Sequence, residues 1–112
     1  MGNRAVITTT NARREDGSFD KNAIGIYLHW HGDWEDVQRF LDLAKDKGVR
    51  KPEEDNYGWA HLCQVIANDL NEYELTIGID TLKNLDCNNG DNGVYIFKDW
   101  KIVDNFKKIK RR

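Results

Sequence analysis

The periodicity of apolar residues changes along this chain, and that change limits the possible folds more than any other feature. In residues 24 to 31, apolar Ile, Leu and Trp side chains alternate with Gly, Tyr and His, as in a strand with one apolar face. Residues 33 to 48 and 55 to 71 instead repeat their apolar side chains at the spacing of about 3.6 residues of amphipathic helices. The β-branched segment 4 to 9 predicts another strand, and the polar loop 11 to 22 joins it to the strand at residues 24 to 31.

Three more strand-like segments follow the helices. Residues 75 to 79 alternate, and residues 94 to 97 and 100 to 103 predict a hairpin around Lys98-Asp99. The predicted order is ββααβββ. Because both helices lie between groups of strands, we expect an α+β fold with an antiparallel sheet of about four to five strands and two amphipathic helices packed on one face.

Local residues support the helix boundaries and a core face. Asp33 is placed to cap the first helix by accepting a hydrogen bond from the backbone N–H of Asp36, and Gly48 is expected to end that helix. Trp30 continues the apolar face of the preceding strand, so its indole is expected in the core. The core-facing residues of the helices are expected to be Trp34, Val37, Phe40, Leu41, Ala44, Trp59, Leu62, Cys63, Val65, Ile66 and Leu70.

Charge is divided unequally along the chain. Residues 1 to 105, the expected single domain, hold 12 basic and 19 acidic side chains, a net charge of −7. An acidic body repels phosphates, which argues against duplex DNA as a ligand. Residues 106 to 112 form a basic C-terminal tail, expected to be a frayed, solubilising end; contact with nucleic acid or an acidic partner is the alternative. Its cationic residues are Lys107, Lys108, Lys110, Arg111 and Arg112.

The sequence also argues against a membrane protein and a disulfide-rich protein. No apolar run reaches the roughly 18 residues that a transmembrane helix needs. The N-terminal residues do not form a secretory signal. Two cysteines, Cys63 and Cys87, are too few for a disulfide scaffold, so we expect reduced thiols in a cytoplasmic protein.

The pair His29 and His31 is the best candidate for metal chemistry. Residues two apart on a strand project from the same side, so both imidazoles could reach one ion. Asp33, or His61 of the second predicted helix, could supply a third ligand. A divalent metal at these residues would make the protein a metal-dependent hydrolase. The simpler interpretation is two solvent-facing histidines at a strand end, because a metal site needs about three or four placed ligands.

Tyr27 shares the predicted strand face with His29 and His31. If the helices cover only the other side of the sheet, these three side chains form an exposed strip. Aromatic residues are enriched at protein interfaces, so the strip predicts a binding surface for a protein partner or a second copy of the chain. An ordinary solvated face is the alternative.

The sequence contains no complete catalytic motif, and no cofactor is expected. Segment 86 to 93 resembles a calcium loop in composition, but Asp91 and Phe97 occupy positions that require Gly and Glu. We therefore predict a tight turn whose side chains bond their own backbone. Cys87 is expected to be exposed in this turn, without an activating base. No nucleophile elbow, P-loop or dinucleotide motif is present, so we predict a non-catalytic binding module.

Seven short segments between about residues 4 and 104 form a recognisable set. They are Gly25-Ile-Tyr-Leu-His-Trp-His-Gly32, Glu54-Asp-Asn-Tyr-Gly-Trp-Ala60, Leu62-Cys-Gln-Val-Ile66, Gly78-Ile-Asp80, Leu85-Asp-Cys87, Gly93-Val-Tyr-Ile96 and Asp99-Trp-Lys-Ile-Val103. Through these segments the chain resembles a family of small uncharacterised proteins from bacteria and their phages or mobile elements. That resemblance implies no activity, ligand or catalytic residue. It implies a genomic setting in which small acidic domains block a larger host or phage protein, as anti-restriction and anti-CRISPR proteins do.

Overall fold

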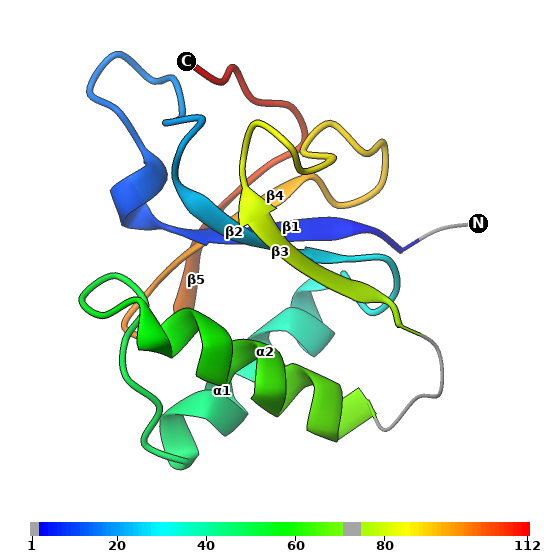
Figure 1. The fold of residues 1–112 in the computed structure, drawn as a ribbon. Coiled ribbons are helices and arrows are strands. Elements are labelled where there is room, and N and C mark those ends of the chain that lie inside the picture. Colours follow the sequence, from blue (N-terminus) through cyan, green and yellow to red (C-terminus); the bar gives the residue numbers. More distant parts are fainter. Residues whose placement is uncertain (1–2, 71–74) are drawn as a thin grey trace.

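The computed structural model describes residues 3–70 and 75–112 (Figure 1). Strands and helices follow each other as ββααβββ, with a short 3-10 helix after the first strand that the sequence pattern did not predict. The predicted helix end at Asn71 lies outside the described residues. The elements are β1 (Ala5–Thr9), η1 (Thr10–Ala12), β2 (Ile24–Leu28), α1 (Trp34–Asp46), α2 (Tyr57–Leu70), β3 (Ile77–Thr81), β4 (Val94–Lys98) and β5 (Lys101–Phe106).

Five strands form one mixed sheet in the order β3-β2-β1-β4-β5. The prediction of a purely antiparallel sheet is wrong at its centre, because β1 and β4 pair in parallel while the other three pairs are antiparallel. The parallel register places Val6 opposite Val94 and Thr9 opposite Phe97. A parallel pair needs a long crossover, which the chain between β1 and β4 supplies.

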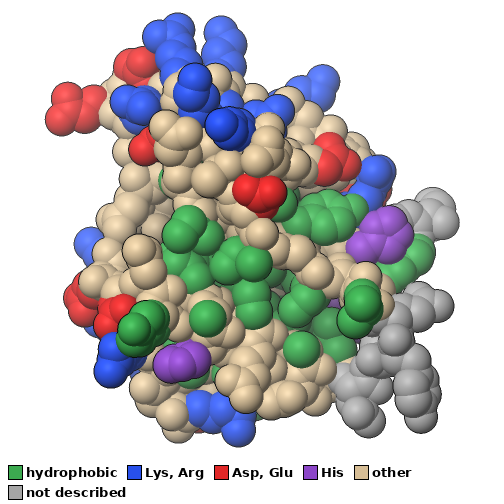
Figure 2. Space-filling model, viewed as in Figure 1, with side chains coloured by type: hydrophobic (Ala, Val, Ile, Leu, Met, Phe, Trp, Pro, Cys, Tyr) green, Lys and Arg blue, Asp and Glu red, His purple; other side chains and the backbone are tan. Residues whose placement is uncertain are grey.

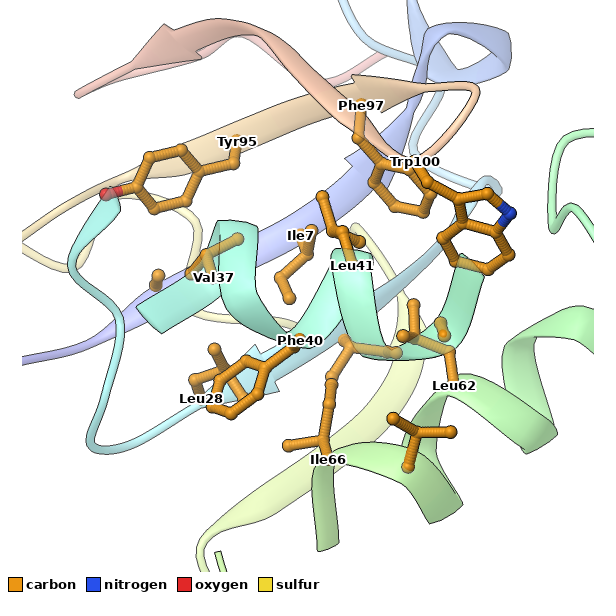
Figure 3. Close-up of a cluster of buried hydrophobic side chains, with 14 of the residues drawn as sticks. Ile7, Leu28, Val37, Phe40, Leu41, Leu62, Ile66, Tyr95, Phe97 and Trp100 are labelled. Atoms are coloured by element: carbon orange, nitrogen blue, oxygen red, sulfur yellow. The ribbon is translucent and has the colours of Figure 1, made fainter. Parts of the chain in front are cut away.

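Both helices contribute to the core on one face of the sheet (Figure 1). The alternation predicted for β2 is confirmed there, since Ile26 and Leu28 are fully buried in this cluster. Figure 3 shows Phe40 of α1 beside Leu28 and near Ile66 of α2. The predicted caps of α1 are also confirmed: Asp33 accepts a hydrogen bond from the Asp36 backbone, and Gly48 has a φ of 73°.

Two tryptophans that were predicted for this core lie at the surface instead. Trp30 is 37% exposed and Trp34 is 53% exposed. β2 ends at Leu28 and the chain bends at His29 and Trp30, so the alternation of the strand does not continue to Trp30. Trp34 is the first residue of α1, and helical side chains point back toward the N-terminus, so its indole extends past the packed part of the helix.

The opposite face of the sheet, expected to be open, carries a second core. Phe19 from the polar loop and Leu82 and Cys87 from the β3–β4 connection are buried against β1 and β4. The expectation of an exposed Cys87 is therefore wrong, and the loop between β1 and β2 is packed. Short-range patterns in the sequence do not predict this second core, because the residues that cover this face of the sheet are isolated apolar residues in polar segments. The buried members are Val6, Ala12, Phe19, Leu82, Cys87, Val94 and Ile96.

The basic tail is docked on this second core, so the expectation of a frayed end is wrong. The backbone N–H of Phe19 donates to the carbonyl of Lys110 at 2.8 Å, and that of Arg112 donates to the carbonyl of Phe19 at 2.9 Å. Ile109 packs against the cluster. The Arg111 guanidinium donates to the carbonyl of Leu82 at 2.7 Å. The tail thus closes the second face.

Asn89 organises the turn that follows β3, as the prediction of an Asx turn requires. Its carbonyl oxygen accepts from the backbone N–H groups of Asp91 and Gly93, each at 3.0 Å. Its amide donates to the carbonyls of Asp86 and Gly93. Gly93 has a φ of 67°, and a Cβ there would collide with the backbone of Phe106. The turn therefore depends on both Asn89 and Gly93.

The hairpin between β4 and β5 turns one residue later than predicted. Its central residues are Asp99 and Trp100, with φ values of 50° and 65°. Two successive positive φ angles give the type of turn that matches the twist of paired strands. Trp100 accepts this conformation while its indole is buried and stacked on Phe97, with ring centroids 5.8 Å apart.

We expect Asn89→Ala to lower the free energy of unfolding by about 2–4 kcal/mol, because four hydrogen bonds of a buried amide are lost together. Urea unfolding followed by tryptophan fluorescence measures the change. Asn22→Ala, at an exposed position, is the matched control with an expected change below about 0.5 kcal/mol. Equal losses in the two variants would contradict this role.

A second prediction concerns alkaline stability. Burial, with a contribution from the Asp33 charge, raises the pKa of Tyr95 to about 12, above the value of about 10 in an unfolded chain. The folded state therefore holds the phenolic proton more tightly, and this stabilisation is present below pH 10 and lost as the pH rises toward 12. Over this pH range the free energy of unfolding of Tyr95→Phe, measured with urea, should fall less than that of wild type. Tyr57→Phe, which changes an exposed tyrosine, should lose as much free energy of unfolding as wild type.

Candidate functional site

The structure keeps Tyr27 and His29 of the predicted recognition strip in contact and places His31 apart from them. Tyr27 lies within β2 and is half-buried on the second core, and burial raises its pKa. His29 follows the end of β2 and is exposed. His31 lies beyond the strand, where its Nδ1 is 3.3 Å from Oδ2 of Asp36 in α1. The prediction that His29 and His31 share one strand face is wrong because β2 ends at Leu28, before both residues, and His31 then adopts a positive φ.

A close backbone approach explains why the chain turns here. The N–H of Gly32 donates to the carbonyl of Asn3 at 2.8 Å, and a Cβ on Gly32 would collide with that carbonyl oxygen and with Ala5. The turn delivers Asp33 to the N-terminus of α1, where the Asn3 amide donates to its carboxylate at 3.0 Å. Only glycine fits this contact, so Gly32 positions both His31 and the helix cap.

An aromatic series remains at the surface beside the end of β2. The hydroxyl of Tyr27 is 3.0 Å from Nδ1 of His29. The His29 and Trp30 rings meet edge to face, with centroids 4.9 Å apart and an interplanar angle of 85°. Trp30, predicted in the core, is a surface residue of this series, and the alternation of the strand gave no signal of that position.

These rings border a hollow of about 450 Å³ on the edge strand β3. The backbone N–H of His29 donates to the carbonyl of Thr76, which extends the β2–β3 pairing past the end of β2 and the start of β3. Leu75 is fully exposed and Ile79 is 48% exposed. We call the hollow and this strand edge the aromatic edge. The hollow is lined by Tyr27, His29, Trp30, Leu75, Thr76, Ile77 and Gly78.

Figure 2 shows this side of the molecule, with hydrophobic side chains gathered over its middle. In the described part of the sheet, β3 pairs only with β2 and leaves its other edge without a strand. Unpaired strand edges are ordinarily protected by charge, proline or a covering element. β3 instead carries exposed Ile79 and partly buried Ile77, with the single charged residue Asp80. The edge is therefore suited to pairing with another chain.

The four residues predicted as metal ligands are distributed over separate environments. His29 contacts Tyr27 and Trp30, whereas His31 contacts Asp36. Partial burial acts to raise the pKa of Asp33, but hydrogen bonds from Asn3 and the Asp36 backbone hold it below its usual value.

His61 lies exposed on α2. Histidines occupy well-separated places in Figure 2. Within residues 3–70 and 75–112, no group of three or more His, Cys, Asp or Glu side chains is arranged to hold an ion.

Neither thiol has the environment of an activated nucleophile. Burial raises the pKa of both Cys63 and Cys87, which disfavours the thiolate. Cys87 is fully buried, with its sulfur 3.6 Å from the carbonyl oxygen of Leu82. Both cysteines are free.

Comparisons of the chain with protein-family models, with curated proteins and with solved structures gave no match. Among the helices that the structure describes, none combines the length and the apolar character needed to cross a membrane.

We expect Cys87 to react slowly with a disulfide thiol reagent at pH near 8 in a Cys63→Ser background. Burial limits access and keeps the thiol protonated, so the rate should lie about tenfold or more below that of the urea-unfolded chain. Release of the reagent chromophore measures both rates. Equal rates in the folded and unfolded protein would contradict the buried position of Cys87.

Proposed function

We propose that this protein is a non-catalytic binding module that docks a protein partner on the aromatic edge. The observation that carries the proposal is an unpaired sheet edge with exposed apolar side chains beside an aromatic hollow. An isolated exposed apolar residue needs no explanation, but several beside one unpaired strand edge do. Here Ile79 lies on β3, Leu75 lies just before that strand, and Trp30 lies on the border of the hollow.

The proposed occupant is an extended segment of the partner that adds a strand to β3. Strand addition takes its affinity from backbone hydrogen bonds and its specificity from pockets for alternate side chains. β3 supplies the free edge, and the hollow of about 450 Å³ is large enough for one apolar or aromatic side chain. Tyr27, His29 and Trp30 surround that side chain with rings, which are favoured at the centre of protein interfaces.

The partner that we propose is a nucleic-acid enzyme of a host cell, which this protein inhibits. The net charge of −7 over residues 1–105 supports this choice, because an acidic surface is complementary to the basic channels that hold nucleic acids. The resemblance to proteins of bacteria, phages and mobile elements agrees with such a role. We also propose a cytoplasmic location, which the two free thiols Cys63 and Cys87 support.

The test is a pull-down from bacterial lysate with immobilised protein, followed by assay of the captured partner. Trp30→Ala and Ile79→Lys alter the aromatic edge. Tyr57→Ala is the matched control, because Tyr57 is an aromatic residue of α2 that is 65% exposed and lies outside the hollow. We expect wild type and the control to retain one partner, and the two edge variants to bind it at least tenfold more weakly, as loss of a central aromatic contact of about 1.4 kcal/mol or more implies.

The captured protein should lose nuclease or helicase activity when wild type is added, and keep it with Trp30→Ala. Capture at background level, or equal capture by all four proteins, would refute docking at this edge. Light scattering addresses self-association: a dimer that Ile79→Lys dissociates would show that a second copy, and not a different protein, occupies the edge.

A further inference from the structure

We propose that the end of the molecule formed by the docked tail is a second binding surface, and that it takes single-stranded nucleic acid. We call it the basic end. Figure 2 shows Lys and Arg side chains gathered at this end, where Figure 1 places the C-terminus. It shares no lining residue with the hollow of the aromatic edge. Its cations are Lys21, Lys108, Lys110 and Arg112.

Backbone pairing holds segments that are distant in the sequence next to each other at the basic end. The N–H of Lys21 donates to the carbonyl of Arg112 at 3.0 Å, and the N–H of Lys83 donates to the carbonyl of Lys21 at 3.0 Å. Phe19 pairs with the tail through Lys110 and Arg112. The cations of the tail are therefore fixed beside Lys21 and Lys83, which reduces the ordering cost of binding a ligand.

Several arginines at this end are already engaged. Arg111 donates to two carbonyls of the β3–β4 connection, Arg14 pairs with Asp20, and Arg112 lies 3.4 Å from Asp16.

By contrast, Lys21, Lys108 and Lys110 form no ion pair with a carboxylate among the residues that the structure describes. Three ammonium groups are thus available for phosphates, whose neutralisation drives binding through counterion release.

Lys108, Lys110 and Arg112 border a second hollow, also of about 450 Å³, with an aromatic wall. Phe19 and Phe106 meet edge to face with centroids 5.5 Å apart, and the Arg13 guanidinium lies 4.5 Å from the Phe106 centroid. Phe106 is only half-buried and lines the hollow.

The side chains of Lys108, Lys110, Arg112 and Asp16 sum to a charge of +2 in this lining. Asp16 opposes an anion, but Ser18 and Arg112 already hydrogen-bond its oxygens.

Cations beside a recessed aromatic ring favour a single strand over other polyanions. An unpaired base can enter the hollow and stack on Phe106 while the lysines contact the flanking phosphates. A duplex keeps its bases stacked inside and brings a dense phosphate surface against the acidic body. A membrane offers charge without a planar ring to fill the hollow. The observations that support binding at the basic end are separate from those that support binding at the aromatic edge.

The test is fluorescence anisotropy with a labelled oligothymidine at about 20 mM and about 150 mM salt. Lys108→Gln with Lys110→Gln should weaken binding about tenfold and make the slope of log K against log salt shallower by about 1.4, from roughly 0.7 per phosphate contact. Lys45→Gln with Lys47→Gln, at the exposed end of α1, is the charge-matched control. It should change neither the affinity for the oligothymidine nor the slope of log K against log salt. Deleting the tail is unsuitable, because its backbone holds Phe19.

Phe106→Leu tests the stacking step. It should weaken oligothymidine binding about tenfold with an unchanged salt slope, as loss of one stacked base requires. Thermal unfolding confirms that each variant used is folded.

Three outcomes overturn the proposal: no anisotropy change with wild type at about 20 mM salt, equal losses in the tail variant and its control, or tighter binding to a duplex of the same length or to phosphatidylserine vesicles.

Discussion

The parallel pairing of β1 with β4 is the contact on which the rest of this fold depends. It places β1, whose five residues are all buried, between β2 and β4 in the middle of the sheet. A central strand of this kind must be covered on both faces. The helices cover one face, and the second is closed by the loop before β2, the β3–β4 connection and the C-terminal segment.

The same topology determines which surfaces are available for binding. With β1 and β4 central, β3 becomes an edge strand although it follows both helices in the sequence. Its free edge lies beside the rings of His29 and Trp30, which the early end of β2 leaves at the surface. The closing of the second face brings the basic tail against Lys21. The two proposed sites therefore arise from the arrangement that also buries β1, and neither requires a separate structural element.

Much of the local structure could be predicted from short-range patterns, and the reasons are visible at particular residues. Asp33 and Gly48 bound α1 through contacts with neighbouring residues, and Asn89 forms its turn with residues close in sequence. The candidate sites could not be predicted in the same way. Trp30 would continue the alternation of β2, but that strand ends at Leu28, and the turn that follows includes the contact between Gly32 and the distant Asn3.

Sequence alone determined the α+β class, the helices and the approximate strand positions, because periodicity and capping act over one or two turns of backbone. Only the tertiary structure decided the parallel β1–β4 pair, the cover of the second face and the burial of Cys87. These depend on contacts between segments far apart in the chain, such as Phe19 with Lys110 and Arg112. Isolated apolar residues in polar loops show no periodicity. The residues that they contact are determined by close packing against the face of the sheet.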